Sequence, residues 1–385
     1  MTVAKERELK SGQRLALDTI RRKPTRGIGI WEINPMEWVM IDRMAGLPEG
    51  SYEKDPVPVY LRMLERSACC MVDQWIPKNP LSMKRDGYDG ATKERTATTG
   101  LKEIVRDGMR IDSPEAVVEH MERVLFPKLE QEIAAFDQEA KVKAMLAFEA
   151  DTQAVLGTGI LKAPDQYPVM TFPSFEYGRY GYENYFMAYA LYPEVMERHF
   201  ALGADLALLH NQAGARAYVE GDLPPYVRTE CDMTDSRGTL ASIESLDRIW
   251  FPHFARCIRP LVDAGVTIIW HSDGNIMQMA PRLLEAGLKG FQGFQYEDGV
   301  DYPRLCGMKA RDGDSLLIVA GVSVTRTLPY GTPEDVRREL RWLVENGPKT
   351  GLFLGASSSI APGVPWENLK TLADGFRHYR EHGRG

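Results

Sequence analysis

The stretch Gly265-Val-Thr-Ile-Ile-Trp-His271-Ser-Asp273-Gly-Asn-Ile276 decides the fold. An apolar run from Val266 to Trp270 stops at a histidine, and a polar turn and an amphipathic run from Ile276 to Ala286 follow. This order predicts a strand, a loop and a helix, with His271 and Asp273 at the carboxyl end of the strand. In parallel sheets with helical crossovers, ligands bind at this edge. We therefore expect His271 and Asp273 to form the centre of a site, as a metal-binding pair or a general acid/base pair.

The same order of signals repeats after His271. Predicted strands cover residues 290–295, 315–322 and 352–354, and a predicted helix follows each of them. One of these helices opens with Thr332-Pro-Glu-Asp335, a capping residue followed by proline. Four β/α units within about 120 residues favour a (β/α)₈ TIM barrel. An open doubly wound sheet is the alternative, although no Gly-x-Gly-x-x-Gly turn joins a strand to a helix here.

The N-terminal part of the chain shows this rhythm less clearly. We expect residues 1–110 to form a helical and irregular extension packed on the barrel, and residues 111–385 to form the barrel as one compact unit. The threonine-rich segment 79–108 predicts a β-hairpin or a flap, and the sequence does not decide between them.

The composition describes an ordinary globular protein. The 385 residues are 44% hydrophobic and 26% charged, and the formal net charge is −7. An acidic chain without a basic stripe argues against nucleic acid as a partner. No apolar run is long enough to span a membrane, and the N-terminus lacks the apolar core of a signal peptide. Five cysteines without paired spacing indicate free thiols, and we expect a cytoplasmic protein.

One segment is unusually aromatic. Between Phe172 and Phe186 lie seven aromatic residues in fifteen positions, interrupted by glycines. These rings either pack a loop onto the core or line a site for a flat ligand. On the second interpretation, Tyr177, Tyr180 and Tyr182 are candidate substrate-binding residues.

Further candidates follow other predicted strands. Glu149 ends a predicted buried strand at 142–148, and Asp232 ends the predicted strand 226–231. The remaining candidates are Glu297, which follows strand 290–295, Arg326, Ser357 and Ser358. An arginine pairs with a substrate carboxylate in a bidentate way, and serines at a strand-to-helix turn donate hydrogen bonds to a substrate or anion. Ion pairs, helix caps and turns are the structural alternatives for all of these residues.

From about Ser242 to the C-terminus, the sequence resembles the uroporphyrinogen decarboxylase superfamily. The resemblance is carried by six motifs: His271-Ser-Asp-Gly-Asn275, Glu285-Ala-Gly287, Tyr296-Glu-Asp-Gly-Val-Asp301, Gly331-Thr-Pro-Glu-Asp-Val336, Ser357-Ser-Ser-Ile-Ala-Pro362 and Val364-Pro-Trp-Glu-Asn-Leu369. The resemblance implies a TIM barrel with its cleft at the carboxyl ends of the strands. True decarboxylases of the tetrapyrrole pathway carry an N-terminal Arg-Gln-Ala-Gly-Arg signature, which this chain lacks. Decarboxylation of uroporphyrinogen is therefore not expected.

The other branch of the superfamily contains methyltransferases that work with corrinoid (cobalamin-type) proteins. Their zinc is bound by a His-x-Cys pair, a glutamate and a later cysteine. In this chain His271 matches the histidine, Asp273 replaces the first cysteine, Glu297 lies near the glutamate, and Ser357-Ser-Ser359 replaces the last cysteine. The resemblance thus implies His271, Asp273 and Glu297 as catalytic residues and as a harder ligand set, which is compatible with zinc but less selective for it.

The function implied by this branch is methyl transfer. We expect demethylation of a small donor, with a methoxylated aromatic compound as one candidate (O-demethylation), and transfer of the methyl group to a corrinoid. The corrinoid would be held by a separate partner protein, since this chain contains no corrinoid-binding domain. A decarboxylase of a small or tetrapyrrole-like acid, or a non-catalytic binder of a corrinoid or tetrapyrrole, are the alternatives. The sequence leaves open whether the protein forms a homodimer.

Overall fold

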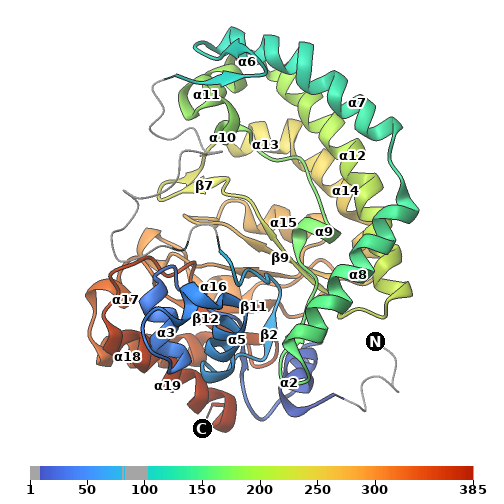
Figure 1. Ribbon diagram of the computed structural model, residues 1–385. Coiled ribbons are helices and arrows are strands. Elements are labelled where there is room, and N and C mark those ends of the chain that lie inside the picture. Colours follow the sequence, from blue (N-terminus) through green and yellow to red (C-terminus); the bar gives the residue numbers. More distant parts are fainter. Residues whose placement is uncertain (1–8, 80–81, 83–102, 385) are drawn as a thin grey trace.

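A closed barrel of parallel strands forms the centre of the computed structural model, which describes residues 9–79, 82 and 103–384 (Figure 1). One parallel sheet has six strands in the order β1-β12-β11-β10-β9-β6, and a second has two, β2 and β5. Single parallel bridges join the two sheets, Trp31 with Met71 next to β1 and β2, and Asp165 with Arg228 next to β5 and β6. The eight strands therefore follow one another around the barrel in chain order. The expected (β/α)₈ fold is confirmed.

The barrel strands are Gly29–Ile30 (β1), Met71–Val72 (β2), Leu161–Lys162 (β5), Tyr226–Glu230 (β6), Thr267–His271 (β9), Gly290–Gln292 (β10), Leu317–Val322 (β11) and Leu352–Ala356 (β12). Their connections are α3 (Trp38–Ala45), α4 (Ser51–Lys54) and α5 (Pro56–Arg66) after β1; α6 (Pro114–His120), a π-helical turn (Met121–Leu125), α7 (Phe126–Ala134) and α8 (Gln138–Leu156) after β2; α9 (Gln166–Val169), α10 (Tyr177–Tyr180), α11 (Tyr182–Leu191) and α12 (Pro193–Glu220) after β5; and α13 (Ile243–Ile249) and α14 (Phe251–Asp263) after β6. The last four strands are followed by α15 (Ala280–Ala286), by α16 (Tyr302–Gly307), by α17 (Thr327–Tyr330) with α18 (Pro333–Asn346), and by α19 (Trp366–His382).

Several predicted elements agree with these bounds. Strands β6, β9, β11 and β12 lie where apolar runs predicted them. Helix α18 begins with a capping box, in which the Thr332 side chain accepts from the backbone N–H of Asp335 and the Asp335 side chain accepts from that of Thr332. Among the described residues, no helix combines the length and the apolar character needed to cross a membrane.

The N-terminal part of the chain differs from the expected extension. Strands β1 and β2 both come from residues 1–110, so this segment supplies two walls of the barrel as well as helices that pack on it. Helix α2 (Ser11–Ile20) precedes β1 and closes one end of the barrel with Ala16, Leu17 and Ile20 in the core. Both strands are only two residues long, which is too short to give a detectable alternation of apolar and polar residues.

Two other expectations concern residues 79–160. The strand predicted at 142–148 is wrong, because these residues lie within α8, whose N-cap Asp137 accepts a hydrogen bond from the backbone of Ala140. Most of the predicted hairpin or flap at 79–108 lies outside the described residues. At its end, β3 (Val105–Arg106) and β4 (Met109–Arg110) form a short antiparallel hairpin.

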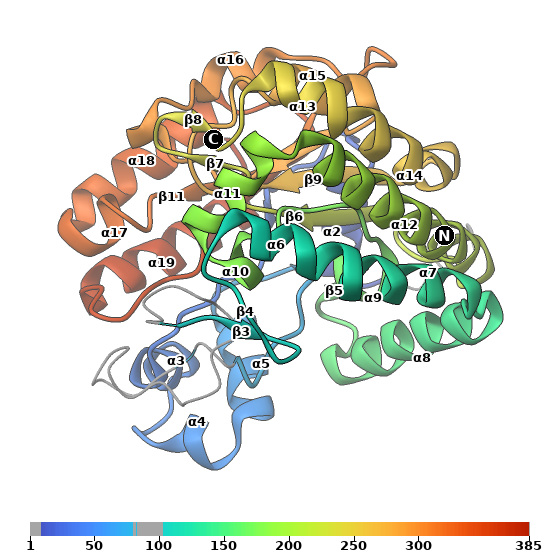
Figure 2. The ribbon, with the colours of Figure 1, turned by 90° about the horizontal axis from the view of Figure 1, so that it is seen from above.

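Helix α12 organises the side of the molecule away from the C-terminal helices. It packs against α14, α8 and α7, and α6 packs against α11, so that these helices form an arc beside the barrel (Figures 1 and 2). Buried Asn211 ties this arc together. Its side chain accepts from the backbone N–H of Thr171 and donates to the carbonyl groups of Thr171 and Cys257. The chain that carries the aromatic segment is thereby held against α12 and α14.

We predict that Asn211→Ala lowers the free energy of unfolding by about 3 kcal/mol, because it removes three hydrogen bonds to buried or partly buried backbone groups. Chemical denaturation followed by circular dichroism measures the loss. Gln131→Ala on the exposed face of α7 is the control and should change stability by less than about 0.5 kcal/mol. Equal effects of the two substitutions would contradict a structural role for the Asn211 amide.

Candidate functional site

The carboxyl ends of the barrel strands bring His271 and its neighbours together. The residue is the last of β9, and its register partners are Glu230 on β6 and Gln292 on β10. Residues paired in parallel strands point to the same side of the sheet, so the three side chains share one layer of the barrel mouth. The His271 side chain is nearly enclosed, with 5% of its surface exposed.

Two glycines shape the space around this histidine. Gly293, which follows β10, has φ +77°, and a Cβ at this position would lie 2.3 Å from Nδ1 of His271. Gly274 has φ +85°, and its Cα passes directly against the backbone of Asp235. Only glycine combines a left-handed backbone with such close approach at low cost. The ring of His271 is thus fixed by the backbone of the next strand.

An acidic cluster with metal-binding spacing surrounds His271. One ligand atom each of Asp232, His271 and Asp273 lies within 4.8 Å of the others, and no other group of this kind is found in the described part of the chain. The backbone N–H of Asp273 donates to Oδ1 of Asp232 at 3.0 Å, which fixes the two loops relative to each other. Burial raises the pKa of the Asp273 carboxyl; His271 opposes this effect, whereas the carboxylates of Asp232 and Glu230 add to it.

The donors of this cluster fit a divalent cation. Nδ1 of His271 and Oδ1 of Asp273 are buried and have no hydrogen-bond partner among the described residues. Unpaired buried polar atoms are costly, and two carboxylates beside an imidazole carry the charge that a cation neutralises. Such nitrogen and oxygen ligands suit zinc but also harder metals, because no thiolate is present in the set.

Glu297 lies apart from this cluster. It belongs to a 3₁₀ turn after β10, Tyr296–Asp298, and its Oε1 accepts hydrogen bonds from Ser323 at 2.7 Å and from Thr325. The structure therefore groups Asp232, rather than Glu297, with His271 and Asp273. The position of Glu297 in the sequence correctly predicted that it lies at the carboxyl end of the barrel. It did not predict that the side chain points to Ser323 and Thr325.

A cleft of about 420 Å³, open to solvent, lies in the barrel mouth beside His271. Its lining is polar and comes from the ends of six strands: Trp31, Glu32, Asn34, Gln74, Arg228, Glu230, His271, Gln292, Ser358 and Ser359. Oε1 of Gln292 is buried without a partner among the described residues, while its amide donates to the carbonyl group of Ser357. Trp31 is the one aromatic side chain in this lining, and the Arg228 guanidinium lies 5.3 Å from the centroid of its ring.

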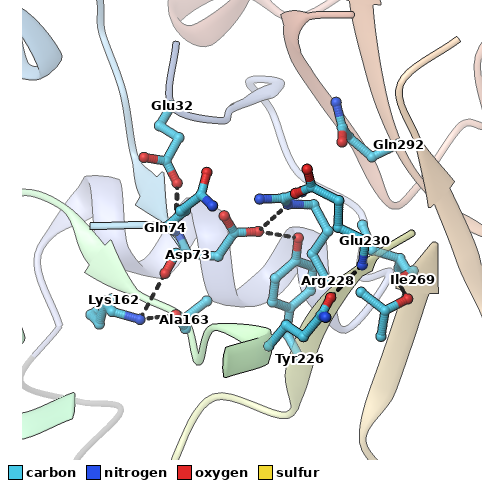
Figure 3. Close-up of polar contacts among 12 residues, drawn as sticks. Glu32, Asp73, Gln74, Lys162, Ala163, Tyr226, Arg228, Glu230, Ile269 and Gln292 are labelled. Carbon is cyan, nitrogen blue, oxygen red and sulfur yellow. Dashed lines mark hydrogen bonds and ion pairs between the residues drawn. The ribbon is translucent and has the colours of Figure 1, made fainter. Parts of the chain in front are cut away.

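A buried ion pair connects the end of β2 with β6, which lies two strands away in the barrel (Figure 3). Oδ2 of Asp73, which follows β2, accepts from Nε of Arg228 at 3.2 Å and from the hydroxyl of Tyr226 at 2.8 Å. Nη1 of Arg228 donates to Glu230 at 2.9 Å. Oε1 of Glu32 accepts from the backbone N–H groups of Asp73 and Gln74 at 2.9 and 2.7 Å.

The charges of this network differ between its carboxyl groups. Burial and the neighbouring Asp73 carboxylate raise the pKa of Glu32 well above its ordinary value. Burial opposes ionisation of Asp73 as well, but the Arg228 guanidinium, hydrogen bonds with Glu32 and Tyr226 and the Lys162 ammonium together outweigh it and lower the pKa of Asp73. Burial also raises the pKa of Glu230, but Arg228 and His271 together outweigh it and lower the pKa of that carboxyl. Of the three carboxyl groups in this network, Glu32 is therefore the one whose pKa is raised.

Glu149 contributes to the barrel wall and not to the lining of this cleft. It is buried on α8, where its carboxylate pairs with Nζ of Lys162 at 3.1 Å. Nζ of Lys162 also donates to the carbonyl groups of Asp73 and Ala163 (Figure 3). The pair thus supports the loop that carries Asp73.

The three candidate tyrosines are spread over different surroundings. The Tyr177 hydroxyl donates to the carbonyl group of Asp232 at 3.1 Å, at the rim of the site. Tyr182 is half-exposed and contacts Tyr177 with tilted rings, whose centroids are 5.2 Å apart. Tyr180 is fully buried, and its hydroxyl bonds to Nδ1 of His120. The structure thus brings Tyr177, and Tyr182 through it, to the site and places Tyr180 in the core.

Of the candidates near the C-terminus, one lines the cleft and two do not. Ser358 lines the cleft, whereas the buried hydroxyl of Ser357 accepts from the backbone N–H of Val324 and holds two loops together. Arg326 is exposed at the start of α17, and its backbone N–H donates to Ser323. The arginine that lines the cleft is instead Arg228.

Glu32, Asp73, Gln74, Arg228, Glu230 and Gln292 were not among the candidates drawn from the sequence. Glu32, Asp73 and Gln74 follow the two-residue strands β1 and β2, whose apolar signal is too weak to locate a strand end. Arg228, Glu230 and Gln292 lie within β6 and β10 and point into the barrel. The charged residues at the alternate positions 228 and 230 of the strand were the available signal.

These features define a TIM-barrel protein whose polar cleft and candidate metal ligands lie at the carboxyl ends of the strands. Residues 230–379 match the family model of uroporphyrinogen decarboxylase. The resemblance found in the sequence is confirmed. A solved structure of a methyltransferase from Methanosarcina mazei is similar in fold, with a TM-score of 0.55, 14% sequence identity, and coverage of 96% of this chain and 98% of that chain. No curated protein matches the sequence.

We predict that Gly293→Ala lowers the free energy of unfolding by about 3 kcal/mol, because it adds a clash with the His271 ring to the cost of a left-handed backbone. Gly313→Ala is the matched control, since Gly313 has φ +86° with no atom near the added Cβ, and should cost only about 1–2 kcal/mol. Combining Gly293→Ala with His271→Ala should recover the steric part. Additive losses in this double-mutant cycle would contradict the contact.

Proposed function

We propose that this protein is a methyltransferase that removes a methyl group from a small donor and transfers it to a corrinoid carried by a separate protein. The observation that carries the proposal is the Asp232–His271–Asp273 cluster beside a solvent-open cleft at the barrel mouth. The superfamily match and the methyltransferase with a similar fold support it by analogy, since a fold by itself does not determine a reaction.

The polar lining of the cleft favours a donor with polar substituents. Asn34, Gln74 and Gln292 offer amide groups, and Trp31 adds an aromatic side chain to the lining. Tyr177 adds an aromatic side chain at the rim. A methoxylated aromatic compound that carries hydroxyl or carboxylate groups fits these surfaces, and we propose this class as the donor.

Asp232, His271 and Asp273 would hold a divalent cation, with zinc as the first candidate. A cation bound there supplies Lewis-acid polarisation of the donor heteroatom, which makes the attached methyl group more electrophilic. The protein contributes the fixed positions of the three ligands. Gly293 fixes the imidazole, and the Asp273 backbone fixes Asp232.

A decarboxylase of a small acid is the second candidate, because Arg228 lines the cleft and is able to bind a carboxylate. The two functions predict different products. Methyl transfer converts cob(I)alamin into methylcobalamin, whereas decarboxylation releases carbon dioxide without any need for a corrinoid.

We predict that the wild-type protein methylates free cob(I)alamin with at least one methoxylated aromatic acid, as followed by the absorbance of methylcobalamin. His271→Ala should reduce the rate by at least about 10²-fold, because it removes a ligand of the cation that activates the donor. Release of carbon dioxide without methylcobalamin would overturn the proposal in favour of the decarboxylase. The absence of turnover across a broad panel of methyl donors would also count against it.

Metal analysis separates the two ligand sets that the sequence and the structure suggest. We predict one divalent cation per chain in the wild-type protein and in Glu297→Gln, and a loss of most of it in His271→Ala and in Asp232→Asn. Elemental analysis after gel filtration measures this content. A loss in Glu297→Gln with retention in Asp232→Asn would instead support the set predicted from sequence.

A further inference from the structure

Glu32 occupies a distinctive position in the cleft. It follows β1, lies on the wall contributed by β1 and β2, and lines the cleft together with His271. Two backbone N–H groups, those of Asp73 and Gln74, hold its Oε1 (Figure 3). Only 2% of its surface is exposed. The carboxyl group is thus rigidly held at the edge of the space that a donor would occupy.

The neighbouring Asp73 makes this carboxyl group a proton carrier. Asp73 is fully buried, and one of its oxygens accepts from both Arg228 and Tyr226. Its other oxygen, Oδ1, has no donor among the described residues. Two adjacent buried carboxyl groups do not both ionise. Because Arg228 stabilises the charge on Asp73, the proton remains on Glu32, in agreement with the raised pKa of that residue.

The other titratable groups that line the cleft have other interactions and are not available as proton donors. Glu230 is ionised by its pairing with Arg228, and an arginine does not give up its proton in proteins. His271 belongs to the candidate metal cluster. Among the described residues that line the cleft, Glu32 is therefore the carboxylic acid able to donate a proton.

A proton donated to the oxygen assists methyl transfer from an ether. As the C–O bond of the donor breaks, the reduced corrinoid acceptor supplies the electron pair of the new bond to carbon. The pair of the broken bond stays on the oxygen, which leaves as an alkoxide or a phenoxide unless it is protonated. A general acid placed at this oxygen typically accelerates such a step by about 10²–10⁴-fold.

We propose that Glu32 is the general acid of this cleft and protonates the oxygen atom of the donor as its methyl group departs, an inference that rests on the proposed function. Glu32 ends the step as a carboxylate and regains its proton from water. Asp73 and Arg228 are positioning residues in this step. They set the charge beside Glu32 and act on the donor oxygen only through Glu32. The titratable groups that act on Glu32 from the surrounding elements are Asp73, Arg228, Tyr60, Cys69 and Tyr226.

The test uses a series of methoxylated aromatic acids whose phenol products differ in pKa. Glu32→Gln keeps the size of the side chain and an oxygen for the two backbone donors but carries no acidic proton. We expect kcat to fall by about 10²–10⁴-fold for donors whose phenol has a high pKa, and by much less for donors with a strongly acidic phenol. The dependence of log kcat on the phenol pKa should become steeper. An equal loss for all donors would overturn the acid role.

Glu149→Gln is the matched control. Glu149 is also a buried glutamate, but its carboxylate pairs with Lys162 outside the cleft lining. It should alter stability and leave the dependence on phenol pKa as in the wild type. A steeper dependence in this variant would show that any disturbance of the buried network produces the effect, and would overturn the assignment to Glu32.

An infrared measurement tests the proton directly and does not need turnover. The difference spectrum of wild type minus Glu32→Gln at pH 7 should contain the carbonyl stretch of a protonated carboxyl group, and this band should vanish at alkaline pH. Its absence at pH 7 would overturn the inference whatever the activity. If the band is present but the wild type demethylates no donor in the series, the proposed methyl transfer fails while the protonated state of Glu32 stands.

Discussion

The buried ion pair between Arg228 and Asp73 is the interaction on which the cleft depends. It joins the end of β2 to β6 across the barrel mouth, and both side chains are almost completely shielded from water. A buried charge is tolerated only when its partner and its hydrogen bonds are complete. Tyr226 and Glu230 supply these bonds, and Lys162 holds the backbone of Asp73 from below. The polar residues of the cleft therefore also hold strands of the barrel together.

The C-terminal half of the fold could be predicted because its strands are long and apolar. Residues 267–271 and 317–322 are wholly buried, and each is followed by clear helix signals such as the Thr332 cap. The strands of the N-terminal half could not be predicted, because β1, β2 and β5 contain only two residues each and are positioned by neighbouring strands. The apolar residues at 142–148 led to the wrong prediction of a strand. They lie in helix α8, and a short apolar run on the buried face of a helix resembles a buried strand.

The site residues that could be predicted are those that follow a long apolar strand. The spacing of His271 and Asp273 after a strong strand was enough to predict that both lie at the rim. Their third neighbour, Asp232, follows β6, and its role depends on which strands are adjacent, which no local pattern reveals. Glu297 was assigned by its distance along the chain, yet Ser323 and Thr325 hold its carboxylate on the next loop.

The distribution of charge divides the cleft into two sides. On the side of β1 and β2, Arg228 compensates Asp73, and burial beside Asp73 raises the pKa of Glu32. On the side of β9, Asp232 and Asp273 have no cationic side chain within the cluster, so their charge favours a bound cation. A donor lying between the two sides would present one heteroatom to both, to the cation through a lone pair and to Glu32 as proton acceptor. This division explains why a site without thiolate ligands would still act on an ether, because a hard cation and a proton donor both act on oxygen.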